Sequence, residues 1–230
     1  MLANKKYENL WEEIMKKMNL RKVVAFMMSL CMLIGVLTGC GGPKVDAAGS
    51  CKAIYDLYIL QDSKGVLDMG MEQSDADTAL KTYDDTMASS IKNLFVSNGL
   101  TVDDDTVNEI VAAREEAMSR LTCTTEITSS DKKTATVSLK TNYIDETGIA
   151  TKASEDAIAQ LEKEKETDTN KRIELISGFF AQNLIDGYKN STPVDDQKEL
   201  TIECSVTGNI WMPNDMTGYG TKLGQAVSGQ

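Results

Sequence analysis

The amino-acid sequence predicts an α+β domain in which helices pack on one face of a curved antiparallel sheet of about four strands, after an N-terminal signal segment. Two observations predict this class. The spacing of apolar residues changes from the period of a helix to the period of a strand near residue 121. The helical period returns from residue 154, and the strand period appears a second time near residue 200. In the strand-like segments apolar and polar residues alternate, so each strand has one apolar face that helices have to cover.

The N-terminal segment has the layout of an export signal. The segment 18–22 is short and basic, and residues 23–37 are almost wholly apolar. A membrane-spanning helix needs roughly 20 apolar residues, so this shorter run favours a signal peptide over residues 1–39. Three acidic residues precede the basic segment, which favours a true start at Met15 or Met18; a genuine N-terminal extension is the alternative.

The end of the apolar run, Leu37-Thr38-Gly39-Cys40, resembles the lipobox of bacterial lipoproteins. The resemblance implies that a diacylglyceryl group, with fatty acids such as palmitate, is attached to the Cys40 thiol, and that cleavage leaves Cys40 as the mature N-terminus. Two or three acyl chains make a lasting anchor, whereas one is marginal. The alternative is a plain signal peptide with an accidental cysteine.

The lipobox interpretation sets the domain boundaries and the location. Residues 40–49 become the lipidated cysteine and a spacer, and residues 50–230 form a single α+β domain. The protein is then expected on the outer, extracytoplasmic face of the cell membrane, held there by the lipid.

Helical spacing predicts the elements of the first part of the domain. We expect helices over residues 47–61, from a cap at Ser74 or Asp75 to the stop at Asn98, and over residues 101–121, the last one capped by Thr101. Gly65 is expected to end the first helix in the left-handed conformation.

Strands and helices then alternate. In chain order we expect strands over 121–127 and 135–143, helices from 154 and over 173–188, strands over 200–206 and 210–212, and a helical turn over 223–227. The segment Thr217–Gly220 is predicted to be a flexible turn.

The charge balance excludes two kinds of partner. Removing residues 1–39 takes six basic and three acidic residues from the 24 and 35 of the full chain, which leaves 18 and 32 and a net charge of −14. Nucleic-acid affinity depends on phosphate contacts from Lys and Arg, so no nucleic acid is expected as a partner. Adhesion to anionic lipid through basic patches is disfavoured for the same reason.

The chain contains no histidine. Serine and cysteine hydrolysis ordinarily needs an imidazole base, and most catalytic zinc sites use histidine ligands, so both classes are nearly excluded. No CxxC pair occurs, and Asp103–Asp105 lacks the spacing and central glycine of an EF-hand loop. We therefore predict no catalytic residue, no metal site and no cofactor.

Three cysteines remain in the mature domain besides Cys40. Cys123 and Cys204 both point to the apolar face of strands that could be neighbours, so a disulfide between them is possible in an oxidising exterior. The alternative is that both are buried thiols that pack as small hydrophobic residues. The same core role is expected for Cys51, which lies on the apolar stripe of the first helix.

The arrangement of elements resembles cystatin-like and NTF2-like domains, in which helices pack into a curved antiparallel sheet. Over residues 47–227 the chain also resembles uncharacterised Gram-positive lipoproteins of a domain-of-unknown-function family, family 5105. The features that carry this resemblance are the lipobox, the helix-rich start, a two-strand hairpin ending in Tyr143-Ile144-Asp145, and the late strand, turn and tryptophan of residues 201–211. The resemblance implies a fold and a location but no activity.

Two functions from different classes follow. The first is a non-enzymatic binding or accessory module of unknown ligand, whose partner is a small apolar ligand, a wall component or another envelope protein. The second is an NTF2-like enzyme that uses carboxylates or a tyrosine in a pocket between helices and sheet. Six aromatic residues are expected near that interface, where core packing is the alternative to lining a pocket: Tyr55, Tyr58, Tyr143, Phe179, Phe180 and Trp211.

Overall fold

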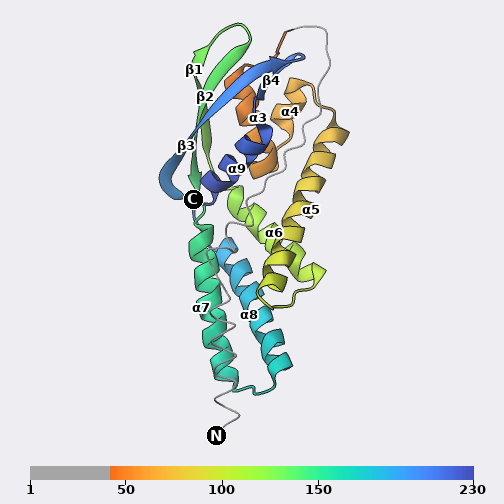
Figure 1. Cartoon of the computed structure of the whole chain (residues 1–230), viewed down its shortest axis with the longest axis vertical. Helices are drawn as coiled ribbons and strands as arrows, with labels where there is room; N and C mark the ends of the chain where they lie inside the picture. The colour runs from red at the N-terminus through yellow and green to blue at the C-terminus, as the bar shows by residue number, and fades with distance from the viewer. Residues whose placement is uncertain (1–41) are drawn as a thin grey trace.

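A computed structural model describes residues 42–230 and has the predicted α+β composition (Figure 1). Four strands form one open antiparallel sheet in the order β1-β2-β3-β4. The signal segment and the lipobox, including Leu37 and Cys40, lie outside the described residues.

The first described helix, α3, spans Ala47–Leu60 and begins at an N-cap aspartate. Asp46 accepts a hydrogen bond from the backbone N–H of Gly49 at 2.7 Å, which satisfies one of the free donors at the helix start. The predicted glycine terminator was wrong, because Gln61 is the residue that adopts the left-handed conformation, with φ 57°. Gly65 instead lies in a short helix, α4 (Lys64–Met69), that the sequence did not indicate.

A long helix, α5 (Gln73–Ser97), and then α6 (Asp104–Met118) complete the first part of the domain. The N-cap of α6 is Asp103 rather than Thr101, and its side chain accepts a hydrogen bond from the N–H of Thr106 at 2.7 Å. The acidic run at residues 103–105 therefore caps a helix and places negative charge at the positive end of its dipole.

The sheet consists of β1 (Cys123–Ser130), β2 (Thr134–Tyr143), β3 (Val194–Thr207) and the short β4 (Ile210–Pro213). In β2 and β3 buried and exposed residues alternate as predicted, which gives the sheet one apolar face. The residues that this face buries in the two strands are Ala135, Val137, Leu139, Thr141, Leu200, Ile202 and Cys204.

Two helices cover the apolar face of the sheet (Figure 1). One is α3, which contacts β1, β2 and β4, and the other is α9 (Met216–Val227), which contacts β2, β3 and β4. Residues 217–220, predicted as a flexible turn, form the first part of α9. Asp215 caps this helix by accepting from the N–H of Gly218 at 2.8 Å, and this cap starts the helix despite the two glycines.

The remaining two helices form an antiparallel hairpin that extends beyond the end of the sheet (Figure 1). They are α7 (Glu146–Glu164) and α8 (Thr169–Lys189). α7 packs against α8, and α8 packs against α6. This placement differs from the expected one, in which all helices would lie against the sheet, and a cystatin-like or NTF2-like fold is not confirmed.

Candidate functional site

The anchor motif lies close in sequence to the folded core. Six residues, 41–46, separate Cys40 from the first residue of α3, Ala47, which is fully buried. None of the helices in the described part of the chain is long and apolar enough to cross a membrane. Cys40 itself lies outside the described residues, so its lipidation is a prediction from the sequence alone.

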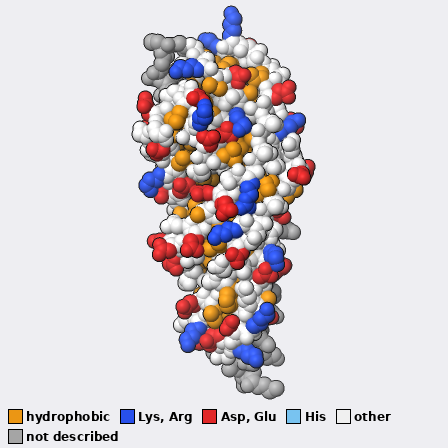
Figure 2. All heavy atoms as spheres, turned by 180° about the vertical axis from the view of Figure 1, so that it is seen from behind, with side chains coloured by type: hydrophobic (Ala, Val, Ile, Leu, Met, Phe, Trp, Pro, Cys, Tyr) orange, Lys and Arg blue, Asp and Glu red, His pale blue; other side chains and the backbone are white. Residues whose placement is uncertain are grey.

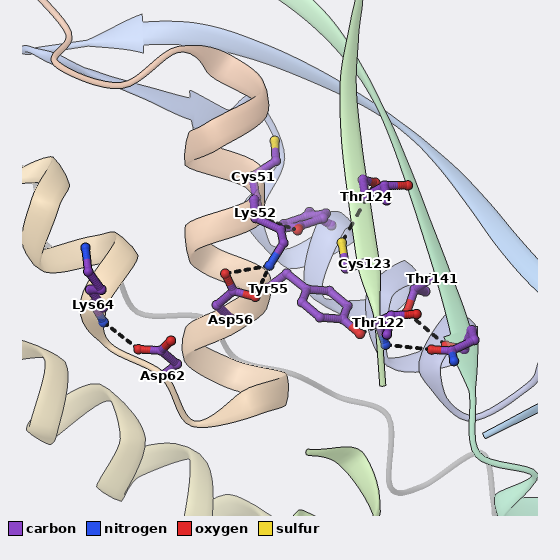
Figure 3. Close-up of polar contacts among 12 residues, drawn as sticks. Cys51, Lys52, Tyr55, Asp56, Asp62, Lys64, Thr122, Cys123, Thr124 and Thr141 are labelled. Carbon is purple, nitrogen blue, oxygen red and sulfur yellow. Dashed lines mark hydrogen bonds and ion pairs between the residues drawn. The ribbon is translucent and has the colours of Figure 1, made fainter. Parts of the chain in front are cut away.

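A polar cluster lies where α3 meets the first two strands (Figure 3). The Tyr55 hydroxyl and the Thr141 hydroxyl lie 2.9 Å apart and are both buried. One turn away, the Lys52 ammonium donates to the Asp56 carboxylate at 2.5 and 2.7 Å. The contact between the two hydroxyls joins α3 to β2 and satisfies both buried groups, whereas the Lys52–Asp56 pair lies within α3.

Cys123, at the start of β1, lies beside this cluster and is only half-buried. Burial raises the pKa of its thiol to about 12, the nearby Lys52 lowers that pKa, and Asp56 raises it. A cysteine nucleophile needs a lowered pKa, so that the thiolate is populated at neutral pH. The geometry therefore gives Cys123 no activated thiolate.

The structure contradicts the proposed pairing of Cys123 with Cys204. Cys123 is opposite Thr141 of β2, whereas Cys204 is opposite Ala135, six residues away on the same strand. Six strand residues span about 20 Å, far beyond the roughly 7 Å between Cα atoms that a disulfide allows. The expectation failed because β2 lies between the two strands, and spacing along the chain does not reveal that order.

Cys204 instead lies next to Cys51 of α3. Their sulfur atoms are 3.5 Å apart, both thiols are free, and both residues are buried, with 0% and 1% of their surface exposed. The prediction that Cys51 and Cys204 are core residues is thus confirmed. Their proximity was not predicted, since no local signal links residues 153 positions apart.

A buried ion pair joins the helices at the base of the hairpin. Arg114 of α6 donates from Nε to Glu146 Oε1 of α7 at 2.6 Å, and from Nη1 to the hydroxyl of Tyr83 of α5 at 3.0 Å. The exposed fractions of the two charged side chains are 6% and 0%. Tyr188 of α8 is buried beside them, and burial first and Glu146 second raise the pKa of its hydroxyl.

The sequence contained one usable signal for this ion pair. Arg114 falls four residues after Ile110 and four before Met118, on the apolar stripe of α6. A charged residue at such a position is almost never buried without a partner. The partner itself could not be predicted, because Glu146 precedes the segment in which helical spacing is recognisable.

Two carboxyl groups lie close together next to that ion pair. They belong to Asp84 of α5 and Glu115 of α6. Burial, reinforced by the charge of Asp84, raises the pKa of Glu115 to about 7, and burial also raises the pKa of Asp84. Two carboxylates that cannot both ionise freely share a proton near neutral pH. This is an arrangement that an acid–base site would use, although structural pairs have it too.

The aromatic residues expected at the helix–sheet interface have different surroundings. Tyr55 and Tyr58 are fully buried, and the ring of Tyr58 lies 5.8 Å from that of Tyr83. Phe180 is buried away from the sheet, with its ring 5.3 Å from that of Phe95. Half-buried positions are occupied by the other three: Tyr143, Phe179 and Trp211. The three buried aromatic residues, Tyr55, Tyr58 and Phe180, therefore pack in the core.

The hollows on the surface of the described residues have mixed polar and apolar linings. One of about 560 Å³ lies between α7 and α8, where Lys152, Asp156, Asn183 and Asp186 line it. Figure 2 shows acidic and basic side chains interspersed over the reverse face of the molecule, with apolar atoms between them. Within residues 42–230, no three acidic or cysteine side chains are grouped so that they could hold a metal ion.

Comparisons with known proteins agree with the family suggested by the sequence. The family described as DUF5105, a domain of unknown function, matches residues 64–221, which is more than half of the chain. No curated protein matches. The crystal structure of ycdA from Bacillus subtilis, named a "putative lipoprotein", superposes with a TM-score of 0.60 at 13% identity. The similarity covers 79% of this chain and 55% of ycdA, so the chain spans about half of the length of that protein. At this identity the likeness concerns the fold alone, but the match to the family profile shows that the chain belongs to the DUF5105 family.

Proposed function

We propose that this protein is a lipid-anchored extracytoplasmic lipoprotein that acts as a non-enzymatic binding or accessory module at the outer face of the cell membrane. The observation that carries the proposal is the lipobox-like Leu37-Thr38-Gly39-Cys40, followed after only six residues by a capped helix in the core. A single fold that begins so soon after the cysteine suits a mature chain whose N-terminus is Cys40. The name of ycdA is in line with this location.

The geometry also suggests which surface faces away from the membrane. The six-residue spacer spans at most about 20 Å when extended, so the start of α3 stays close to the lipid. In Figure 1 the start of α3 lies at one end of the molecule and the turn of the α7–α8 hairpin at the other. We infer that the hairpin extends toward the cell exterior, where a wall component or another envelope protein is accessible.

An accessory role is favoured over catalysis because the cysteine and tyrosine side chains that could act as catalytic groups are not activated or not accessible. The Cys123 thiol has a raised pKa, and the tyrosines beneath the sheet are buried in packed surroundings. The alternative, an enzyme that uses carboxylates, rests on one feature, the neighbouring carboxyl groups of Asp84 and Glu115, whose pKa values burial raises. That pair lies between α5 and α6 rather than between helices and sheet.

The anchoring proposal is tested by the variant Cys40→Ser, with Cys31→Ser as the matched control. Cys31 lies inside the apolar run and is not followed by a cleavage motif. We expect Cys40→Ser to appear in the medium or to remain as the unprocessed precursor, whereas Cys31→Ser stays processed and membrane-bound. A processed, membrane-bound Cys40→Ser protein would show that the lipobox interpretation is wrong.

A further inference from the structure

The close pair of cysteines is the feature of the core that the proposed function does not use. Cys51 lies in the second turn of α3, and Cys204 lies near the end of β3. The two sulfur atoms would have to approach by roughly 1.5 Å from their separation of 3.5 Å to reach the bonding distance of about 2.05 Å. A side-chain adjustment of this size does not require the helix to leave the sheet.

The surroundings hold the two side chains in place. Cys204 is opposite Ala135 of β2 and Pro213 of β4, so two neighbouring strands flank it. On the other side, the Tyr219 hydroxyl of α9 donates to the backbone carbonyl of Cys51 at 3.2 Å. The pair therefore sits at the junction of α3, α9 and the sheet, where the backbone on both sides is fixed.

We propose that Cys51 and Cys204 are joined by a disulfide bond in the exported protein, which makes this pair a modification site. The inference rests on the proposed export, because disulfides form and persist in oxidising compartments outside the cytoplasm. The half-buried Cys123 is excluded as a partner of Cys204 by the distance along the sheet. It keeps its thiol.

The bond forms by thiol–disulfide exchange while the chain folds outside the membrane. A thiolate of the pair attacks the disulfide of an oxidised protein dithiol, which gives a mixed disulfide and releases one thiol. The second cysteine then displaces the carrier. The two cysteines lose two protons and two electrons, and the carrier disulfide gains both electrons as it becomes a dithiol.

Burial explains the timing of this reaction. In the folded domain the hydrogen bond to Cys204, followed by burial, raises the pKa of Cys51, and both side chains are hidden from solvent. An external oxidant therefore reaches the thiols before the core closes. Once formed, the bond ties the first helix after the anchor to the third strand, across 153 residues of chain.

The test is a peptide map of the full exported chain, alkylated under denaturing conditions without reductant. We expect a cross-linked peptide that contains Cys51 and Cys204, together with an alkylated Cys123. Cys123→Ala keeps the cross-link, and Cys204→Ala loses it. We also expect reductant to shift the denaturant midpoint of the wild type and of Cys123→Ala to lower concentration, while the midpoint of Cys204→Ala does not respond.

Failure of this inference is distinguishable from failure of the proposed location. If the protein fractionates as an exported lipoprotein and both Cys51 and Cys204 are fully alkylated, the disulfide is overturned and the location stands. If the protein is found inside the cell, refolding the full chain in a glutathione redox buffer decides the matter. Formation of the cross-link there supports the geometry, and free thiols at both positions overturn it.

Discussion

Arg114 and Glu146 form the point at which side chains of α5, α6 and α7 converge in the interior. Burying two charges is costly, and their mutual attraction offsets the cost only while both are present. The second carboxylate oxygen of Glu146, Oε2, is buried and accepts no hydrogen bond from the described residues. We therefore expect the pair to specify how the base of the hairpin packs rather than to add much net stability, so that removing one partner alone is costly.

We expect Arg114→Met to lower the free energy of unfolding by about 3–5 kcal/mol, because it leaves the Glu146 carboxylate buried without a partner. The double variant Arg114→Met, Glu146→Met should recover much of that loss. Urea unfolding of the two variants measures the difference. Lys92→Met, which breaks the exposed pair with Asp104, is the control and should cost less than about 1 kcal/mol. A single variant no worse than this control would contradict the account.

The Asp84–Glu115 pair makes stability depend on pH. The pKa of Glu115 is about 7 in the folded chain against a reference of 4.5, so the folded state holds a proton that the unfolded state releases. Its contribution is therefore fully present below pH 4.5 and is lost as the pH rises through 7. Because Glu115 is partly exposed, we expect a loss of only about 1–2 kcal/mol across this range.

Chemical denaturation at several pH values between 4.5 and 8 checks this expectation. Glu115→Gln should flatten the profile, since the amide does not titrate. Glu109→Gln, an exposed position on the same helix, should keep the wild-type profile. The explanation is wrong if Glu115→Gln loses as much stability with rising pH as the wild type does.

The α7–α8 hairpin depends on close backbone approach, and its glycines provide a matched pair of positions. A Cβ at Gly187 would meet the Ile149 side chain of α7 at 2.7 Å, whereas a Cβ at Gly178, on the same helix, would meet nothing within 4 Å. We expect Gly187→Ala to destabilise the domain by about 1–3 kcal/mol through overpacking. Gly178→Ala should stabilise it by about 0.5–1 kcal/mol, because alanine favours helix. Thermal or urea unfolding compares them, and equal effects would mean that the two helices are not packed as described.

The same hairpin shows where prediction of elements from sequence succeeds and where it does not. The long apolar stripe of α8 and the alternation in β2 and β3 were predicted correctly, because many large residues repeat the pattern. The start of α7 was placed eight residues late. Its first two turns bury only Glu146, Ala150 and Ala153, which carry no apolar periodicity. α4 was missed for a similar reason, since a six-residue helix is too short to show a period.

For the candidate site, the sequence indicated the core role of Cys51 and Cys204 but not their proximity, and it did not indicate that Cys123 is only half-buried. A lipobox is a local pattern, whereas the contact between Cys51 and Cys204 depends on strand order. The expected pairing of Cys123 with Cys204 was wrong because it assumed that β1 and β3 are neighbours. The contact between Arg114 and Glu146 likewise depends on how α5, α6, α7 and α8 pack together, which spacing along the chain does not reveal.

Anchoring through Cys40 predicts one orientation of the whole protein on the membrane. α7 has 19 residues, which corresponds to about 28 Å of helix, and its turn lies at the opposite end from the start of α3 (Figure 1). A fluorophore on Lys44→Cys should be quenched strongly by nitroxide headgroups when the lipidated protein is placed in vesicles. The same fluorophore on Lys165→Cys, at the exposed hairpin turn, should be quenched weakly. Equal quenching at both positions would contradict the proposed orientation.

The proposed location depends on lipid attachment at Cys40 and on Cys40 being the mature N-terminus. The most direct measurement is mass spectrometry of the N-terminal peptide of the protein extracted from membranes. We expect a peptide that begins at Cys40 and carries a diacylglyceryl group on its sulfur. A mature chain that begins at any other residue, or a peptide with an unmodified Cys40 thiol, would contradict it.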